Sequence, residues 1–333
     1  MVFVRHRHPP GRLTKTTAPL LLLITMANIY QYQSANIRRT WLMFIVFFLV
    51  FGALGYAISM AYGSWDYLVF ALIFSVVYSL ISFYSSASIA LTMARAKPIE
   101  KADNPMLYNI VENLSITAGL PMPKLYVTPE MQINAFAAGR DPQHAVVAVT
   151  EGALERLDKT ELQGVLAHEL SHVGNRDILV STVAAILAGI IALTADIFLR
   201  SLMFGGFGGR GGRGGNNNGE AQEIFFIVAI VLSILAPIGT MLIQFAISRR
   251  REALADASGV LLTRYPEGLI SALQKIAVDE TPMASAKDST AHMWIDTPFK
   301  GKGTSWWHKM FMTHPPIEER IKALQEMGGI GAE

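Results

Sequence analysis

The chain has no cysteine among its 333 residues. Disulfides, thiolate-bound metals and cysteine nucleophiles are therefore excluded, and any metal site must be built from histidine and carboxylate side chains. Charged residues are also scarce, at 16% of the chain, and there is no long basic run of the kind that follows a phosphate backbone. We therefore expect no nucleic-acid partner.

Apolar residues, in contrast, are abundant. They make up 51% of the sequence, and the mean hydropathy is +0.34. An ordinary water-soluble globule has fewer apolar residues and more charge. The composition indicates a membrane protein, with the lipid bilayer as a partner.

Four segments are long and apolar enough to cross a bilayer as helices, for which about 20 residues suffice. They cover residues 41–62, 67–92, 178–204 and 223–248. One end of each segment is flanked by basic residues, and these ends all lie on the same side: Arg38, Arg39, Arg95, Lys97, Arg176 and Arg249 to Arg251. The positive-inside rule makes that side cytoplasmic, although three arginines on the opposite loop weaken the bias. We expect a multi-pass protein of the cytoplasmic (inner) membrane.

The first forty residues and one loop differ from the rest. Residues 1–40 form an N-terminal extension, and its apolar run at 19–24 is too short for a signal peptide and is followed by no small-residue cleavage site. Met26 would make a natural amino terminus, and the residues before it would then be a dispensable or misassigned extension; the sequence alone leaves this point open. Residues 205–222 are mostly Gly and Asn and predict a flexible outer loop.

Between the second and third spans, residues 94–177 have the composition of a soluble α+β unit. Asn104-Pro105 predicts the start of its first helix. Three short strands are expected at 124–127, 133–138 and 145–150. Residues 249–333 form a second soluble part, with helices expected at 266–278 and 317–327.

Another helix of the α+β unit carries the strongest chemical signal. Asp158, with Glu161 three residues later, predicts a capping box at its start. The helix contains His168-Glu169-Leu170-Ser171-His172. A spacing of four residues places both imidazoles on one face, where they can bind one zinc ion, while Glu169 can act as general base on a water molecule at that ion. The alternative is a pair of histidines with an ordinary place in the core or on the surface.

Glu252 is the candidate for a third ligand. The histidine helix ends where the third span begins, and Glu252 follows the end of the fourth, so an antiparallel pair of these spans returns it to the same membrane face. Two imidazoles and one carboxylate favour zinc over other divalent ions. Alternatively, Arg249 to Arg251 anchor the membrane interface and Glu252 pairs with one of them. Spacing alone leaves both interpretations open.

The chain resembles the HtpX membrane zinc metalloproteases, which are related to the eukaryotic prenyl-protein endoprotease. The resemblance covers residues 26–330 and rests on the four spans and these motifs: Asn134-Ala135-Phe136-Ala137, His168-Glu169-Leu170-Ser171-His172 with Asn175 and Asp177, Ser248-Arg249-x-Arg251-Glu252-x-x-Ala255-Asp256, and His314-Pro315-Pro316 with Arg320-Ile321. It implies that Glu252 is the third zinc ligand and that Asp256 orients a ligand. It also implies that Arg320, Asn175 and Asp177 lie around the ligands. His314 would stabilise the transition state, or would be a structural histidine in a proline-flanked turn.

The motif and the resemblance together predict a zinc metalloendopeptidase with one Zn²⁺ per chain. The expected fold is a multi-pass α-helical membrane protein with a cytoplasmic α+β zincin-like metalloprotease domain. Family members cleave damaged or misfolded membrane proteins, often under envelope or heat stress, so the expected partners are protein or peptide substrates. The alternating strand that contains Asn134, Ala135, Phe136 and Ala137 is expected to lie at a sheet edge and to align the substrate as an added strand.

Three other functions share parts of this pattern. An intramembrane protease would carry the motif within an apolar span, but this helix begins with Asp158, Lys159 and Glu161, which are too polar for lipid. A prenyl-peptide processing protease has the same chemistry but more membrane structure. A non-enzymatic membrane scaffold or transporter would show polar residues in several spans, whereas these spans are nearly free of charge.

Overall fold

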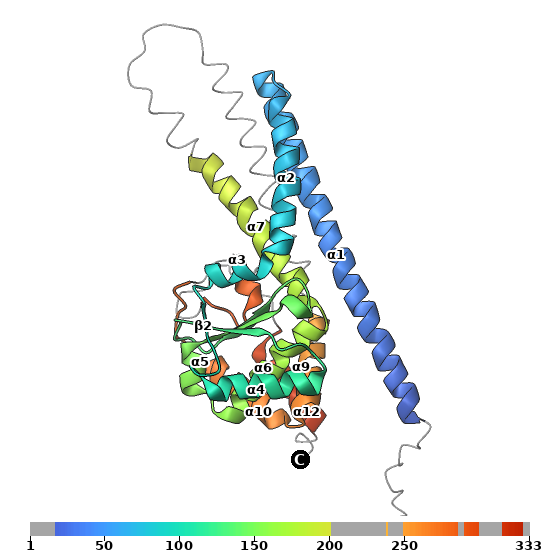
Figure 1. Ribbon diagram of the computed structural model, residues 1–333, viewed down its shortest axis with the longest axis vertical. Helices are drawn as coiled ribbons and strands as arrows, with labels where there is room; N and C mark the ends of the chain where they lie inside the picture. The colour runs from blue at the N-terminus through green and yellow to red at the C-terminus, as the bar shows by residue number, and fades with distance from the viewer. Residues whose placement is uncertain (1–16, 201–237, 239–248, 286–289, 300–314, 329–333) are drawn as a thin grey trace, which may run out of the picture.

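The computed structural model describes residues 17–200, 238, 249–285, 290–299 and 315–328. Apart from Ile238, the fourth span expected at 223–248 lies outside the described residues, as do the outer loop at 205–222 and His314. Within the described part, long helices extend from a unit of sheet and shorter helices (Figure 1).

Three helices of the described part are long and apolar enough to cross a membrane. α1 (Thr17–Tyr62) contains the candidate span Ser34–Met60, α2 (Asp66–Tyr84) is a candidate over its whole length, and α7 (Asp177–Arg200) contains Asp177–Asp196. A buried apolar cluster joins α1 to α7, and its members include Met43, Phe47, Val183 and Leu187. The outward faces of α1 and α2 are apolar and exposed, as is usual for helices that contact lipid. These helices correspond to three of the four expected spans.

The boundaries of two of these helices differ from the expected ones. α1 begins at Thr17, so the described residues before 41 belong to the same helix as the first candidate span, which begins at Ser34. The second span ends at Tyr84 instead of near 92, because the backbone turns at Ser85 and starts a new helix, α3 (Ser86–Met93). α3 buries Ala90 and Leu91 in a cluster with residues of the sheet. The apolar residues that lengthened the expected span therefore contact protein instead of lipid.

The sheet has four strands in the order β1-β2-β4-β3. The strands are β1 (Lys97–Pro98), β2 (Lys124–Thr128), β3 (Ala135–Ala138) and β4 (Val146–Thr150). β2 and β4 run parallel, whereas β1 is antiparallel to β2 and β3 is antiparallel to β4. β3 therefore lies at an edge of the sheet, where its sequence pattern predicted it.

Several helices pack on the sheet and on one another (Figure 1). α4 (Pro105–Ala118) begins where the Asn104 side chain accepts the amide of Leu107, and it ends at Gly119, whose positive φ of 66° suits glycine. The other elements are η1 (Pro142–His144), α5 (Glu151–Arg156), α6 (Lys159–Gly174), α9 (Arg249–Thr263), α10 (Pro266–Val278), η3 (Ala291–Met293) and α12 (Ile317–Gly328). One apolar core joins α4, α6, α10 and α12 to the sheet. The helices that the sequence predicted in the soluble parts are confirmed.

Glycines allow two neighbouring helices to approach α6 closely. A Cβ atom on Gly164 of α6 would lie 2.6 Å from the backbone nitrogen of Leu269 in α10. A Cβ atom on Gly259 of α9 would lie 3.1 Å from the backbone nitrogen of His168. Side chains at these positions would push the helices apart in a closely packed interior. α9 is thereby held directly against the part of α6 that contains the His-Glu-x-x-His motif.

The junction of α6 and α7 is short. Only Asn175 and Arg176 separate the last residue of α6 from the first residue of α7. Arg176 has a φ of 59°, which turns the chain between the two helices. The histidine helix therefore leads directly into a candidate membrane span.

Candidate metal centre

The first turn of α6 is held by the capping box that the sequence predicted. The Asp158 carboxylate accepts the amides of Thr160 and Glu161 at 2.8 and 2.9 Å, and the Glu161 carboxylate accepts the amide of Asp158 at 2.8 Å. Glu161 also accepts a bond of 2.6 Å from Nζ of Lys275 on α10. These contacts fix α6 against α10, and so determine which way the side chains of its later turns point.

Three side chains with metal-binding atoms converge beside α6. Nε2 of His168 and Nε2 of His172 are 3.2 Å apart. Glu252 of α9 places its carboxylate oxygens 3.7 Å from Nε2 of His168 and 3.6 Å from Nε2 of His172. One such atom from each of the three residues lies within 4.8 Å of the others, and within the described part of the chain no second group of this kind is found.

These distances fit a single tetrahedral zinc ion. Two nitrogen ligands bound at about 2.0–2.1 Å and at a tetrahedral angle lie about 3.3 Å apart. The separation of the two Nε2 atoms is 3.2 Å. Two imidazoles and one carboxylate are also a donor set of catalytic zinc sites, in which the fourth position is left for water or substrate. The residues present therefore fit the metal by both geometry and donor type.

Each of the two imidazoles is held through its other ring nitrogen. Nδ1 of His168 lies 2.8 Å from Oδ1 of Asp256, and Nδ1 of His172 lies 3.1 Å from Oδ2 of Asp177. A carboxylate at Nδ1 favours the tautomer that carries the proton there. When the ring is neutral, the lone pair of Nε2 therefore faces the metal position and Glu252.

Arg320 of α12 holds Asp256 in turn. Its Nε and Nη2 atoms donate to the two carboxylate oxygens at 2.9 and 2.7 Å. Burial alone raises the pKa of Asp256, but the charge of Arg320 and the hydrogen bonds from His168 and Arg320 outweigh burial and hold that pKa well below its usual range. Asp256 therefore stays ionised and accepts from both neighbours, and the C-terminal helix supports a ligand on α6.

The pKa values of the two histidines are shifted in opposite directions. Burial lowers the pKa of His168 to about 4, an effect larger than the opposing one of Asp256. Burial also lowers the pKa of His172, but the surrounding carboxylates, of which Glu252 has the largest effect, outweigh it and raise the pKa to about 9. At neutral pH, His168 is therefore neutral and ready to bind a metal, whereas His172 must release a proton when the metal binds.

Glu169 lies between the two histidines in the sequence and is buried beside them. Its negative charge acts on both His172 and Arg320. The carboxylate is therefore within electrostatic reach of the metal position. A carboxylate in this place can accept a proton from a water molecule that attacks a substrate.

The surroundings of Asp177 include two contacts that sequence reasoning missed. Asn36 of α1 donates from Nδ2 to Oδ1 of Asp177 at 2.7 Å, and Nη1 of Arg251 lies 3.7 Å from the same oxygen. Asn175 also lies here, but the atom that it contributes is its backbone carbonyl, which accepts from Asn36 at 3.3 Å. Asn36 gave no signal in the sequence, since it is one polar residue in a long helix far from the motif.

The strand expected to bind substrate lies at the sheet edge but is partly paired. The carbonyl of Asn134 faces β4, where it accepts the amide of Thr150. By the alternation of an antiparallel pair, the backbone groups of Ala135 and Ala137 face away from the sheet. The outward carbonyl of Ala135 already accepts the amide of Ile295 at 3.2 Å. The edge is therefore less open than the sequence indicated.

The structure brings most of the predicted site residues together. Around the two histidines lie Glu169, Glu252, Asp256, Asp177 and Arg320, which come from α6, α7, α9 and α12. His314 lies outside the described residues. α6 is not among the candidate membrane spans of the described part, in agreement with its polar first turn.

Comparisons with known proteins identify relatives over most of the chain. The family model of peptidase family M48 matches residues 101–328, which include every residue of the metal cluster. The protease HtpX homolog of Caldanaerobacter subterraneus subsp. tengcongensis is 46% identical over 306 residues, or 91% of this chain and 99% of that protein. The protease HtpX homolog of Tropheryma whipplei strain Twist is 43% identical over 301 residues, or 90% of this chain and 99% of that protein. Among solved structures, that of S. mikatae Ste24p matches with a TM-score of 0.45 and 16% identity over 90% of this chain and 67% of that chain.

Proposed function

Because this chain belongs to peptidase family M48 as a homologue of the protease HtpX, and is therefore a membrane metalloprotease, we propose that its metal is zinc and that it cleaves membrane proteins at the cytoplasmic face. The observation that carries the proposal is the convergence of His168, His172 and Glu252, with the two Nε2 atoms 3.2 Å apart. These three residues are the proposed ligands. Membership of a protease family rules out the non-enzymatic scaffold.

The proposed reaction is hydrolysis of a peptide bond with Glu169 as general base. A bound zinc ion would supply an acidified water molecule and would polarise the peptide carbonyl. Glu169 takes a proton from the attacking water and passes it to the leaving amine. Asp256 and Asp177 keep the imidazoles in position through Nδ1. We keep as a prediction from its motif that His314 stabilises the peptide carbonyl oxygen, which becomes negatively charged when water attacks.

Membrane-protein substrates are supported by the position of the site. The histidine helix is two residues away from α7, so the metal centre lies close to the end of a candidate span. Arg38, Arg249 and Arg250 are exposed on this side of the candidate spans, which by the positive-inside rule supports a cytoplasmic location. A sheet edge binds the backbone of a peptide with little regard to side chains. This suits an enzyme that removes misfolded or damaged membrane proteins during quality control and stress.

Removal and replacement of the metal tests this proposal. We expect detergent-purified protein, stripped with a chelator, to lose cleavage of an unfolded casein-like substrate and of a misfolded membrane protein. One equivalent of Zn²⁺ should restore both activities, whereas Mg²⁺ should not, because imidazole ligands suit zinc and not magnesium. A protein that binds one zinc ion yet cleaves neither substrate would contradict the proposed activity. A protein that binds no zinc would contradict the ligand assignment.

A further inference from the structure

A short C-terminal segment runs beside the beginning of β3. The amide of Ile295 donates to the carbonyl of Ala135 at 3.2 Å. On either side of this bond, the Phe136 ring packs edge-to-face on the Trp294 ring with centroids 4.8 Å apart, and the Asn134 side chain donates to the carbonyl of Asp296 at 3.0 Å. Residue numbers rise along one segment as they fall along the other. The segment therefore runs antiparallel to β3. Between these described residues, the one backbone–backbone hydrogen bond is that of Ile295 with Ala135, and residues 294–297 form no β-strand.

Side-chain hydrogen bonds hold the segment beyond the end of β3. The Gln132 side chain donates to the carbonyl of Thr297 at 3.0 Å. Upstream, the Glu130 carboxylate accepts the amides of Ala284 and Ser285 at 2.9 and 2.8 Å, so the C-terminal part is held at a second place. Trp294 and Ile295 are both buried. We refer to residues 294–297 as the paired segment.

Two hydrogen bonds of the Ile295 backbone connect the paired segment to the sheet edge on one side and to a residue that supports the metal centre on the other. Its amide is bound to Ala135 of β3, while its carbonyl accepts from Nη1 of Arg320 at 3.4 Å. Arg320 also donates to Asp256, which holds His168. A peptide that lay along the edge of β3 next to the metal would have to use the outward carbonyl of Ala135, the group that Ile295 occupies.

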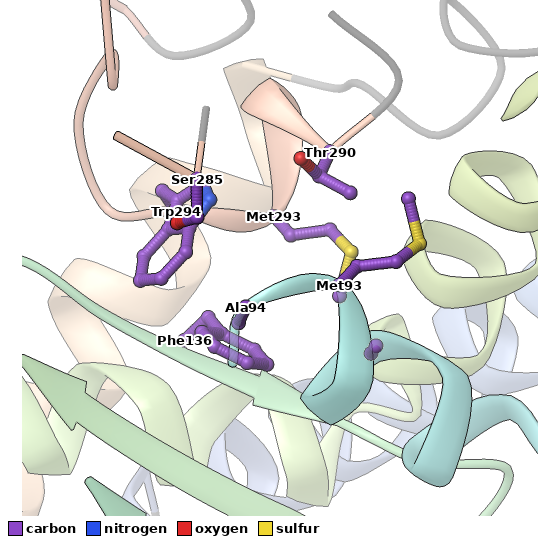
Figure 2. A pocket seen from close by; sticks show the side chains of 8 residues that line it. Met93, Ala94, Phe136, Ser285, Thr290, Met293 and Trp294 are labelled. Atoms are coloured by element: carbon purple, nitrogen blue, oxygen red, sulfur yellow. The ribbon is translucent and has the colours of Figure 1, made fainter. Parts of the chain in front are cut away.

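Trp294 lines a small, mostly apolar pocket. Figure 2 shows Trp294 and Phe136 close to each other, with Met93, Ala94 and Met293 around the same pocket. Met93 and Ala94 come from the end of α3 and from the residue that follows it, at the end of the helix that leads away from the second candidate span. The side chain of Trp294 thereby fastens the paired segment to the face of the sheet that α3 covers.

We propose that the paired segment covers the peptide-binding edge of β3 in place of a substrate, and that it has to leave Ala135 before a substrate can pair there. This inference rests on the proposed function, since it takes β3 to be the edge that aligns substrate. In the structure, the outward carbonyl of Ala135 is already hydrogen-bonded to Ile295. The backbone groups of Ala137, the next outward-facing residue of β3, also face away from β4. The protease is thus held in an autoinhibited form by its own chain.

A reversible cross-link tests the proposal, and the absence of cysteine from the natural chain makes it free of background. In the zinc-loaded, detergent-purified full chain, Ala135→Cys and Ile295→Cys are combined, oxidised, and then reduced with a phosphine that does not bind zinc strongly. We expect the oxidised protein to lose cleavage of an unfolded peptide substrate and the reduced protein to regain it. The two single variants, oxidised in parallel, are the matched controls and should not respond to the reductant.

The outcomes separate this inference from the proposed function. If the fully cross-linked protein cleaves as fast as the reduced one, the segment is a fixed wall of the site and the proposal is overturned. If the natural chain itself cleaves nothing, the proposed function fails, and a second measurement still decides the inference. In the double variant that also carries Glu169→Gln, a saturating unfolded peptide should slow disulfide formation, because it displaces the segment. An unchanged rate of disulfide formation would overturn the proposal whether or not the enzyme is active.

Discussion

Replacement of Glu169 by glutamine is expected to lower kcat for peptide cleavage by about a hundred- to ten-thousand-fold, the range of contributions made by general acid–base groups. Glutamine has nearly the same size and occupies the same buried place, but it cannot accept the proton of the attacking water. The proposed zinc ligands His168, His172 and Glu252 are left intact, so the variant should still bind one zinc ion. The measurement is single-substrate kinetics together with metal analysis of the same preparation.

Glu155→Gln is the matched control for this experiment. Glu155 lies on α5 with its side chain exposed, and it undergoes the same change of charge and size. It should leave both kcat and zinc content unchanged. Full activity in Glu169→Gln would show that another group serves as the base. Loss of zinc from that variant would show that Glu169 helps to hold the metal, in which case loss of activity would say nothing about proton transfer.

Replacement of Glu252 by alanine is expected to remove both the metal and the activity. Loss of a group that only supports a ligand typically lowers metal affinity by about 10–100-fold, so loss of a direct ligand should cost at least about 100-fold. The change also removes the charge that does most to raise the pKa of His172. A lower pKa at His172 by itself favours metal binding at neutral pH. A fall in affinity would therefore report the lost ligand and not an altered proton balance.

Two further variants show whether Glu252 acts as a ligand or as a partner of the neighbouring arginines. Arg250→Gln changes an exposed residue of the same helix and should leave zinc affinity unchanged. Asp256→Asn removes the support of His168 and should lower the affinity less than Glu252→Ala does. Calorimetric titration with zinc measures the zinc affinity of all three variants, and thermal unfolding measures their stability. If Glu252→Ala keeps its affinity for zinc while Arg250→Gln loses stability, the interpretation of Glu252 as part of a membrane-interface anchor is correct.

The local features of the site could be predicted from the sequence because they depend on residues close together in the chain. Asp158 and Glu161 form the expected capping box, and the spacing of His168 and His172 places both rings on one face of α6. The approach of Glu252 to the histidines also agrees with the prediction, which rests on the position of Glu252 after an apolar segment that follows the histidine helix in the sequence.

Features that depend on packing between distant segments could not be predicted in this way. Asn36 reaches Asp177 across helices α1 and α7, and the pairing of Ile295 with Ala135 joins residues with no shared motif. The end of the second span was also misplaced, because an apolar run that packs on a sheet has the same composition as one that faces lipid. Hydropathy measures how apolar a residue is, but it does not identify what that residue contacts.

The short junction between α6 and α7 sets the distance between the metal position and the start of a candidate membrane span. Nδ1 of His172 lies 3.1 Å from Oδ2 of Asp177, where the candidate span begins. With a metal bound to the imidazole at about 2.0–2.1 Å, the metal position lies within about 10 Å of the start of that span. An extended chain covers about 3.3–3.6 Å per residue, so a substrate anchored in the same bilayer needs roughly three residues outside its own span to arrive at the metal. A series of anchored substrates with lengthened Gly/Ser spacers should therefore show a sharp onset of cleavage near that length, whereas equal cleavage without any spacer would contradict it. The distance of a peptide bond from the bilayer, and not the amino-acid sequence around it, would then determine where the enzyme cleaves.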